Sequence, residues 1–306
     1  MSKVKTKIEE EKVIAFLKSN FNEQISMFTF IKGGESSQAF SFDVGGESFV
    51  IRVNRDLLAF EKDRYSFVNF HSEFIPIPEV IKIGVFDEKY YYAISKKVEG
   101  KMLNELSDVE YEEIFPELMS ILDVVHSVDI SKTSGFGKWE ADGAVEAQTW
   151  KEYVLAVKNY VLATENTPSL FETSFLEKDL WEEIYERVKG LLIYCPEERY
   201  LIHGDYGSDN VIADKGKITG VIDWAGAKYG DFLYDIAWLN FWNPQKNPMN
   251  FFKNYYKSKE LSENFSERVM CYQLRIGLSS LSFFAYSDQE EKYQKAKEKL
   301  LAIMKG

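Results

Sequence analysis

The chain has 306 residues, 45% of them hydrophobic and 28% charged, which is typical of a globular protein with room for one large domain or two lobes. Its formal net charge of −12 argues against a nucleic-acid binder, which needs basic patches, and suits the attraction of a cationic small molecule. No apolar stretch approaches the roughly 20 residues that span a bilayer, and the N-terminus has no apolar signal segment, so we expect a cytoplasmic monomer without nucleic-acid or membrane partners.

The first hundred residues predict a small β lobe with one main helix. Short apolar runs broken by glycine pairs indicate strands, and Gly45-Gly46 has the composition of a tight hairpin turn. Apolar residues at helical spacing indicate the helices. The expected elements are, in chain order, a helix over 8–19, three strands between 25 and 53, a helix over 57–72, and strands over 79–86 and 90–98.

The remaining residues predict a larger, mainly helical lobe. Residues 129–148 are rich in small and polar side chains and indicate a loop. We place the domains at 1–99 and 100–306, with a hinge near 95–99. The expected helices cover 108–128, 149–163, 172–194, 231–242, 265–285 and 288–304.

Residues 201–231 carry the most specific chemical pattern. Asp205 and Asn210 lie in a loop before a predicted hairpin, and Asp223 lies just after it, so we expect these side chains to converge. A carboxylate at Asp205 can orient a substrate hydroxyl and accept its proton. An amide oxygen and a second carboxylate, at Asn210 and Asp223, are suitable ligands for Mg²⁺. The pattern predicts phosphoryl transfer from a magnesium nucleotide.

The segment HGDYGSDN at 203–210 resembles the catalytic loop of the aminoglycoside phosphotransferases. The segments GGESSQAFSFDVGG, TSGFG and LRIGL are similar to the hygromycin B phosphotransferase branch. The resemblance implies an α+β, protein-kinase-like fold with two lobes, a five-stranded β lobe and a larger helical lobe. It also implies Mg²⁺ and ATP or GTP as phosphate donor, and an aminoglycoside hydroxyl, most specifically one of hygromycin B, as acceptor. His203 would pack inward and brace the loop.

Several residues of the first lobe are candidates for the nucleotide site. Arg52 occupies the strand position where kinases carry a lysine that contacts the phosphates and pairs with an acid on the next helix. Either Asp63 or Glu61 can be this acid, and we favour Asp63. Ser36 and Ser37 lie in the loop expected to cover the phosphates. The segment Ser95-Lys96-Lys97-Val98 resembles the inter-lobe hinge, whose backbone would bind the purine.

Candidates for the acceptor site are weaker. Asp209 adds a negative charge beside the catalytic loop, and Trp238 and Trp242 share a helix face where a ring can stack on a sugar. Asp231 and Asp235 are interpreted as a helix N-cap and a buried brace for the loop. The acceptor alternatives remain another aminoglycoside, a macrolide, or a metabolite such as an amino alcohol or sugar. A non-catalytic nucleotide-binding module would not need all three of Asp205, Asn210 and Asp223.

Overall fold

The computed structural model describes residues 6–31, 34, 37–140, 144–164, 167–207, 209–243, 246, 248–255 and 263–305. The chain divides into two compact units, which we describe separately. The N-terminal unit comprises the described residues of 4–110 and 209–225, and the C-terminal unit those of 111–208 and 226–306.

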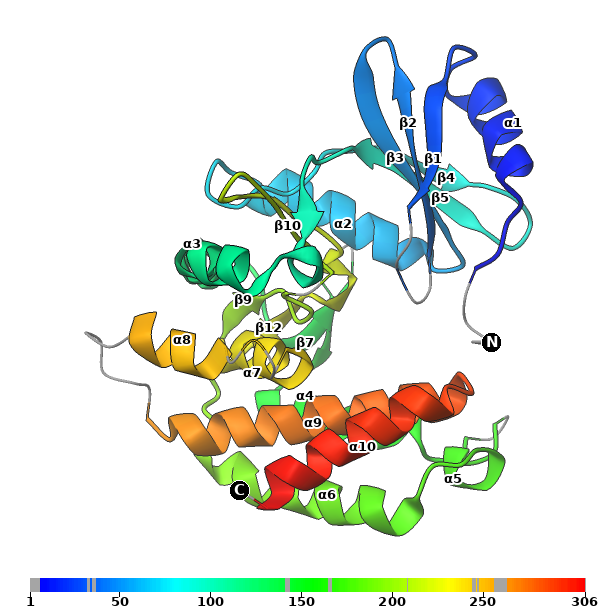
Figure 1. The fold of residues 1–306 in the computed structure, drawn as a ribbon. Coiled ribbons are helices and arrows are strands. Elements are labelled where there is room, and N and C mark those ends of the chain that lie inside the picture. The colour runs from blue at the N-terminus through cyan, green and yellow to red at the C-terminus, as the bar shows by residue number, and fades with distance from the viewer. Residues whose placement is uncertain are drawn as a thin grey trace. The chain divides into compact units, whose positions relative to one another are not determined.

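A five-stranded antiparallel sheet forms the centre of the N-terminal unit, in the order β1-β2-β3-β5-β4 (Figure 1). This confirms the five strands expected from the sequence. Gly45 and Gly46 join β2 to β3 with φ of +61° and +88°, so the hairpin turn needs two residues that tolerate the left-handed region. The strands are β1 Ser26–Ile31, β2 Gln38–Val44, β3 Glu47–Asn54, β4 Val80–Val85 and β5 Tyr91–Lys96.

The two faces of this sheet pack against different helices. Alternate residues of β3, Ile51 and Val53 among them, are buried with Val13 and Leu17 of helix α1 (Glu10–Asn20). The opposite face buries Ala93 with Phe60 of helix α2 (Leu57–Phe70). Because side chains alternate along a strand, Arg52 lies on the α2 face.

Residues 209–225 also belong to the N-terminal unit, although the sequence interpretation placed them in the second domain. Strand β10 (Val211–Asp214) pairs with β11 (Lys217–Val221) on one side and with β6 (Lys101–Met102) on the other. The Thr219 hydroxyl donates to the Glu99 carbonyl at 2.7 Å, which ties this hairpin to the end of the first hundred residues. A boundary at 99 and 100 remains a prediction.

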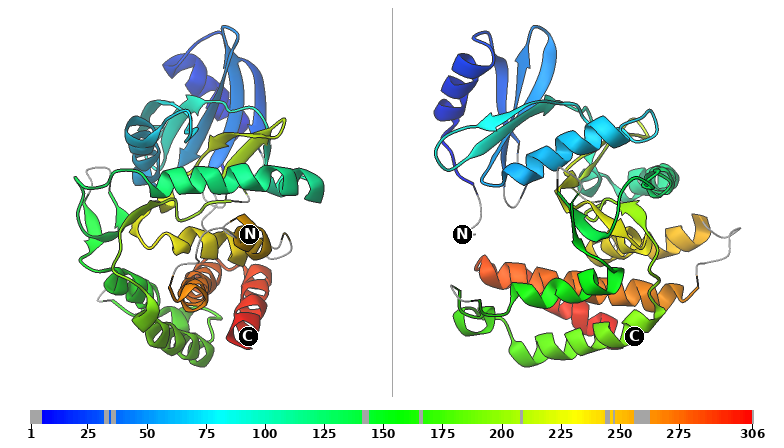
Figure 2. Two further views of the ribbon diagram at one scale, coloured as in Figure 1. Left: turned by 90° about the vertical axis from the view of Figure 1, so that its left-hand side faces the viewer. Right: turned by 180° about the vertical axis from the view of Figure 1, so that it is seen from behind.

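The C-terminal unit is mainly helical, with α9 at its centre. Helix α9 is buried on most of its surface and packs against α6, α7 and α10. In Figure 2, α9 (orange) and α10 (red) run side by side. Among the described residues, no helix is long and apolar enough to cross a membrane. The helices are α3 Asp108–His126 (from Tyr111 onward), α4 Trp150–Leu155, α5 Leu170–Thr173, α6 Lys178–Leu191, α7 Leu233–Trp242, α8 Pro248–Tyr255, α9 Phe265–Tyr286 and α10 Glu290–Lys305.

A small sheet of the order β8-β7-β12-β9 completes the unit. Its strands are β7 Phe136–Trp139, β8 Val145–Ala147, β9 Tyr200–Ile202 and β12 Lys228–Gly230. The expectation that 129–148 is entirely loop was wrong, because β7 and β8 lie within it. Strand β7 pairs with β12, about ninety residues later in the chain, so its conformation depends on a distant partner.

Candidate active site

The predicted catalytic loop follows directly from strand β9, which ends at Ile202. A buried carboxylate holds its backbone: Asp235 accepts from the amide of His203 at 3.0 Å and from that of Gly204 at 2.7 Å. The His126 imidazole lies 3.1 Å from the same carboxylate. Asp235 has no exposed surface. The interpretation of Asp235 as a buried brace of this loop is therefore confirmed.

His203 is fully buried, and its Nδ1 accepts from the amide of Asp205 at 3.3 Å. This contact orients the ring toward the loop backbone and not toward solvent, as expected of a bracing residue. Tyr206, the residue after Asp205, is also buried, and its hydroxyl donates to the Leu118 carbonyl of α3 at 3.0 Å. Asp205 lies between these two buried side chains and is only partly buried. The loop is thus anchored on both sides of Asp205, the residue that the sequence predicts to be catalytic.

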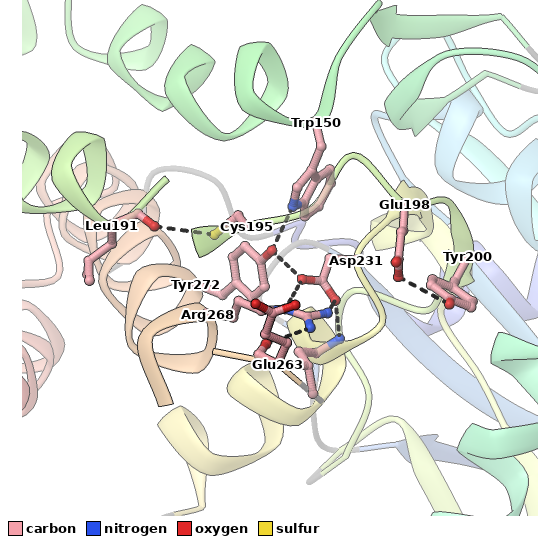
Figure 3. Close-up of polar contacts among 10 residues, drawn as sticks. Trp150, Leu191, Cys195, Glu198, Tyr200, Asp231, Glu263, Arg268 and Tyr272 are labelled. Carbon is pink, nitrogen blue, oxygen red and sulfur yellow. Dashed lines mark hydrogen bonds and ion pairs between the residues drawn. The ribbon is translucent and has the colours of Figure 1, made fainter. Parts of the chain in front are cut away.

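A second buried carboxylate, Asp231, stabilises the start of α7 (Figure 3). It accepts from Arg268 Nη2 at 2.6 Å and Nε at 2.8 Å, from the Tyr272 hydroxyl at 2.5 Å, and from the Leu233 amide at 3.0 Å. Trp150 Nε1 in turn donates to the Tyr272 hydroxyl at 3.0 Å. Burial and the negative charge of Asp231 raise the pKa of Tyr272 well above its ordinary value. Asp231 therefore joins α7 to α9 and is a structural residue.

In the N-terminal unit, Arg52 pairs with Asp63, which decides between the two acids left open by the sequence. Burial lowers the pKa of Arg52, but the negative charges of Asp63 and Asp223 raise it by more. The pKa of Arg52 is therefore above its ordinary value. The other oxygen of Asp63 accepts from the Trp224 amide at 2.7 Å. Lys62 Nζ donates to the Ala225 carbonyl at 2.9 Å. Two neighbouring side chains of α2 thus hold the segment that follows Asp223.

Asp223 itself is half-buried and has φ of +60°, a left-handed conformation that is uncommon for a residue other than glycine. Burial and the like charge of Asp63 raise the pKa of Asp223 to about 6, against the opposing effect of Arg52. The carbonyl of Asn210 accepts from the Ile222 amide at 2.9 Å, so Asn210 lies opposite the residue before Asp223. A carboxylate disfavoured by burial and by a second carboxylate is one whose charged form a cation would stabilise.

Asn210 and Asp223 fit the preference of Mg²⁺ for oxygen ligands, with water and phosphate completing the coordination. Within the described part of the chain, no group of three or more His, Cys, Asp and Glu side chains is arranged to hold a metal by itself. Asn210 and Asp223 as ligands of a nucleotide-bound Mg²⁺ remain a prediction.

The other nucleotide-site candidates lie around the sheet of the N-terminal unit. Ser37 accepts at its hydroxyl from Asn54 Nδ2 at 3.1 Å, which connects the loop before β2 to the end of β3. Ser36 lies outside the described residues. Lys96 is paired with Glu47 at 2.7 Å. Val98 packs closely on the hairpin, since a Cβ on Gly220 would lie 2.9 Å from its Cγ1.

Asp209 lies in the N-terminal unit and contributes to the raised pKa of Asp223.

Trp238 and Trp242 lie in the C-terminal unit, with ring centroids 6.2 Å apart on α7. Trp242 lines a cavity of ≈ 300 Å³ whose charged lining residues are Lys292, Lys295, Lys299 and a single carboxylate, Glu298. Three ammonium groups disfavour a cationic ligand in that cavity, whereas Trp238 is not among the residues lining it. A substrate role for either tryptophan remains a prediction.

Sequence reasoning missed two residues that contact the loop or its brace. His126 was part of a predicted helix, and a single histidine at a helix end carries no signal of its partner. Lys228 is 2% exposed, although lysine is usually a surface residue. No pattern in the sequence around it indicates that it is buried.

Comparison with known proteins identifies relatives of this chain. The model of a family described as "Phosphotransferase enzyme family" matches residues 28–267. The Hygromycin-B 4-O-kinase of Escherichia coli is 34% identical over 281 residues, which cover 90% of this chain and 80% of the relative.

Solved structures extend the likeness to three dimensions. A crystal structure of a thermostable mutant of aminoglycoside phosphotransferase APH(4)-Ia, a ternary complex with AMP-PNP and hygromycin B, matches with a TM-score of 0.84 and 32% identity, covering 96% of this chain and 98% of that chain. The GDP complex of wild-type aminoglycoside 2'-phosphotransferase-IIIa matches with a TM-score of 0.71 and 16% identity, covering 97% and 98%, which bears on the fold alone. The predicted α+β, kinase-like fold is confirmed.

Proposed function

Because the chain belongs to the phosphotransferase enzyme family, we propose that it transfers the γ-phosphoryl group of a nucleotide to a hydroxyl group of hygromycin B. The transfer would give resistance to this antibiotic. The observation that carries the choice of acceptor is the 34% identity to a hygromycin B kinase over 90% of the chain. The braced loop at Asp205 and the pair of Arg52 with Asp63 support the chemistry.

Asp205 is the catalytic residue of this proposal. It orients the acceptor hydroxyl and accepts its proton as the hydroxyl oxygen forms a bond to the γ-phosphorus. The bond from that phosphorus to the β–γ bridging oxygen breaks, and the nucleoside diphosphate leaves. A fixed carboxylate serves this purpose because its direction is set before the substrate binds. The buried Asp235 supplies that fixation through the amides of His203 and Gly204.

Arg52 contacts the phosphates of the nucleotide, and Asp63 holds its guanidinium in place. Asn210 and Asp223 would hold Mg²⁺, which when bound neutralises charge on the phosphate oxygens. We assign the contact with the phosphates from this side to Ser37, in the loop before β2, and, from the sequence alone, to Ser36. The backbone from Lys96 to Val98 binds the purine of ATP or GTP.

The acceptor is a polycation, and the net charge of −12 gives a field that favours its approach. Asp209 adds a carboxylate near the catalytic segment, and Trp238 offers a half-buried ring for a sugar face. Charge-assisted hydrogen bonds between carboxylates and ammonium groups would supply much of the recognition.

The test is a transfer assay with the purified chain. ATP and GTP are each offered with hygromycin B, a second aminoglycoside, a macrolide and an amino alcohol, and nucleoside diphosphate release is measured with and without Mg²⁺. We expect release with hygromycin B, and a product heavier by one phosphoryl group. The Asp205→Ala variant serves as the matched inactive control. Release only with another acceptor would refute hygromycin B and keep the kinase chemistry.

A growth assay tests the biological consequence. A sensitive bacterium that expresses the chain is expected to grow on hygromycin B, and one that expresses Asp205→Ala at equal soluble level is not. Equal sensitivity of both strains would contradict the proposal.

A further inference from the structure

Lys228 is a buried lysine whose ammonium group lies against the catalytic loop. It begins β12, where it pairs with Ile202 of β9, the last residue before the loop. Its Nζ donates to the carbonyl of Gly226 at 2.6 Å. The same Nζ lies 4.5 Å from the centroid of the Tyr234 ring. Only 2% of the residue is exposed, so the charge is enclosed by protein.

This ammonium group occupies the space where a side chain at Gly204 would be. A Cβ on Gly204 would lie 1.9 Å from Lys228 Nζ and 2.4 Å from the Gly226 carbonyl oxygen. Gly204 has φ of +75°, so its backbone turns around this group in the left-handed region. Position 204 therefore requires glycine for two reasons: Lys228 Nζ fills the space of a side chain, and the turn has a positive φ.

Gly226, whose carbonyl accepts from Lys228 Nζ, also lies beside Asp205. A Cβ on Gly226 would lie 3.4 Å from Asp205 Cβ, which is ordinary van der Waals contact. Two residues thus lie between Lys228 and the proposed catalytic Asp205. Gly204 precedes Asp205 in the chain, and Gly226 lies beside it. Asp235 holds the loop at the amides of His203 and Gly204, and Lys228 Nζ lies where a side chain of Gly204 would be.

A buried ammonium group is costly for the stability of a protein unless it is compensated. A methionine has nearly the same length and would fill the same space without that cost. We infer that Lys228 is a positioning residue of the phosphoryl transfer, which holds Gly204 and Gly226 so that Asp205 keeps its reactive orientation. This inference rests on the proposed function.

Arg275 provides a matched control in the same unit. It is 5% exposed and lies 5.9 Å from the centroid of the same Tyr234 ring. Its guanidinium donates to the Tyr234 hydroxyl at 3.2 Å and to the Ser279 hydroxyl at 3.0 Å. These partners are on α7 and α9, away from the loop backbone. Removing either cation takes one buried charge from the surroundings of Tyr234, but only Lys228 packs on Gly204.

The experiment compares Lys228→Met and Arg275→Met with the wild type. Steady-state kcat and KM are measured for nucleotide and for hygromycin B, per folded enzyme as judged by circular dichroism. Hydrogen–deuterium exchange of the peptide 200–207 is measured without substrate. We expect Lys228→Met to lower kcat about 10- to 100-fold with both KM values within about threefold, because a small misplacement of a catalytic group has this cost. We also expect faster exchange in this peptide.

Arg275→Met is expected to leave kcat and exchange of 200–207 unchanged, whatever its effect on the melting temperature. Equal losses of kcat in the two variants would overturn the inference, since the effect would then be general destabilisation. Wild-type kcat and wild-type exchange in Lys228→Met would overturn it as well. If the wild type transfers phosphate to no acceptor, the proposed function fails, and the exchange of 200–207 alone decides whether Lys228 holds the loop.

Discussion

Asp63 connects the proposed phosphate-binding arginine to the segment that carries the proposed metal ligand, so its removal has two separable effects. One carboxylate oxygen pairs with Arg52, and the other accepts from the Trp224 amide at 2.7 Å. Asp63→Asn removes the charge but keeps an oxygen that can accept from Trp224. Asp63→Ala removes both interactions. The difference between the two variants therefore isolates the contact with Trp224.

The magnitudes follow from burial. The side chains of Arg52 and Asp63 are 20% and 6% exposed. Breaking a buried ion pair costs about 3–5 kcal/mol, and since Arg52 keeps some contact with solvent we expect the free energy of unfolding to fall by about 3 kcal/mol in Asp63→Asn. Asp63→Ala also leaves the Trp224 amide without its acceptor, which costs about 1–3 kcal/mol more.

The assay is equilibrium unfolding in urea followed by circular dichroism, combined with exchange of the Trp224 amide. Glu61→Gln is the control, because Glu61 lies on the same helix without pairing with Arg52, and it should change the free energy of unfolding by less than about 0.5 kcal/mol. The alanine variant should lose protection of the Trp224 amide, and the asparagine variant should retain it. Equal stability of the asparagine and alanine variants would refute the bridging role, and an effect of Asp63→Asn no larger than that of Glu61→Gln would refute the ion-pair argument.

Four further predictions concern single residues. Asp205→Ala should lower kcat about 10²–10⁴-fold while calorimetric nucleotide affinity is unchanged, and a loss below about tenfold would remove its catalytic assignment. Asp223→Asn should weaken the enhancement of nucleotide affinity by Mg²⁺, since an amide replaces the one formal charge assigned to the metal; a titration that retains the full enhancement would exclude it as a ligand. Arg52→Ala should raise the nucleotide KM and lower kcat, and Arg52→Lys should recover much of the activity because it retains a cation; unaltered kinetics in the alanine variant would assign the phosphates to another residue. Asp231→Asn should lower the free energy of unfolding by about 3–5 kcal/mol, because it leaves Arg268 buried without its carboxylate; a thermal melt like that of the wild type would contradict this.

The sequence was informative where a pattern is local. The strands of the first sheet and the helices α2, α9 and α10 follow from apolar spacing, and the Gly45-Gly46 turn follows from backbone preference. The choice between Glu61 and Asp63 could also have been made, because Asp63 follows the buried Phe60 by three residues and so shares its face of the helix. Glu61 lies on a different face.

Contacts with distant partners were not predictable in this way. Strands β7 and β12 are three or four residues long, and neither has a periodicity that identifies it as a strand. The burial of Lys228 depends on the position of Gly204 and Tyr234, which no spacing along the chain reveals. Asp235 was recognised as a brace, but its third contact, with His126, joins residues more than a hundred positions apart.

The N-terminal unit is discontinuous in sequence, and this has a consequence for its folding during synthesis. Strand β6 cannot acquire its partner β10 until the ribosome has made roughly a hundred further residues, which takes about 5–20 s at bacterial rates of synthesis. Until then the Thr219 contact with Glu99 and the contacts of α2 with Trp224 and Ala225 are missing, so Lys62 and Asp63 are present without the segment they hold. Closing a loop of this length also delays folding, because its entropic cost precedes the contacts that compensate it. A fragment that ends at residue 99 would therefore encode the five-stranded sheet but not the finished unit, since β6, β10 and β11 would be missing.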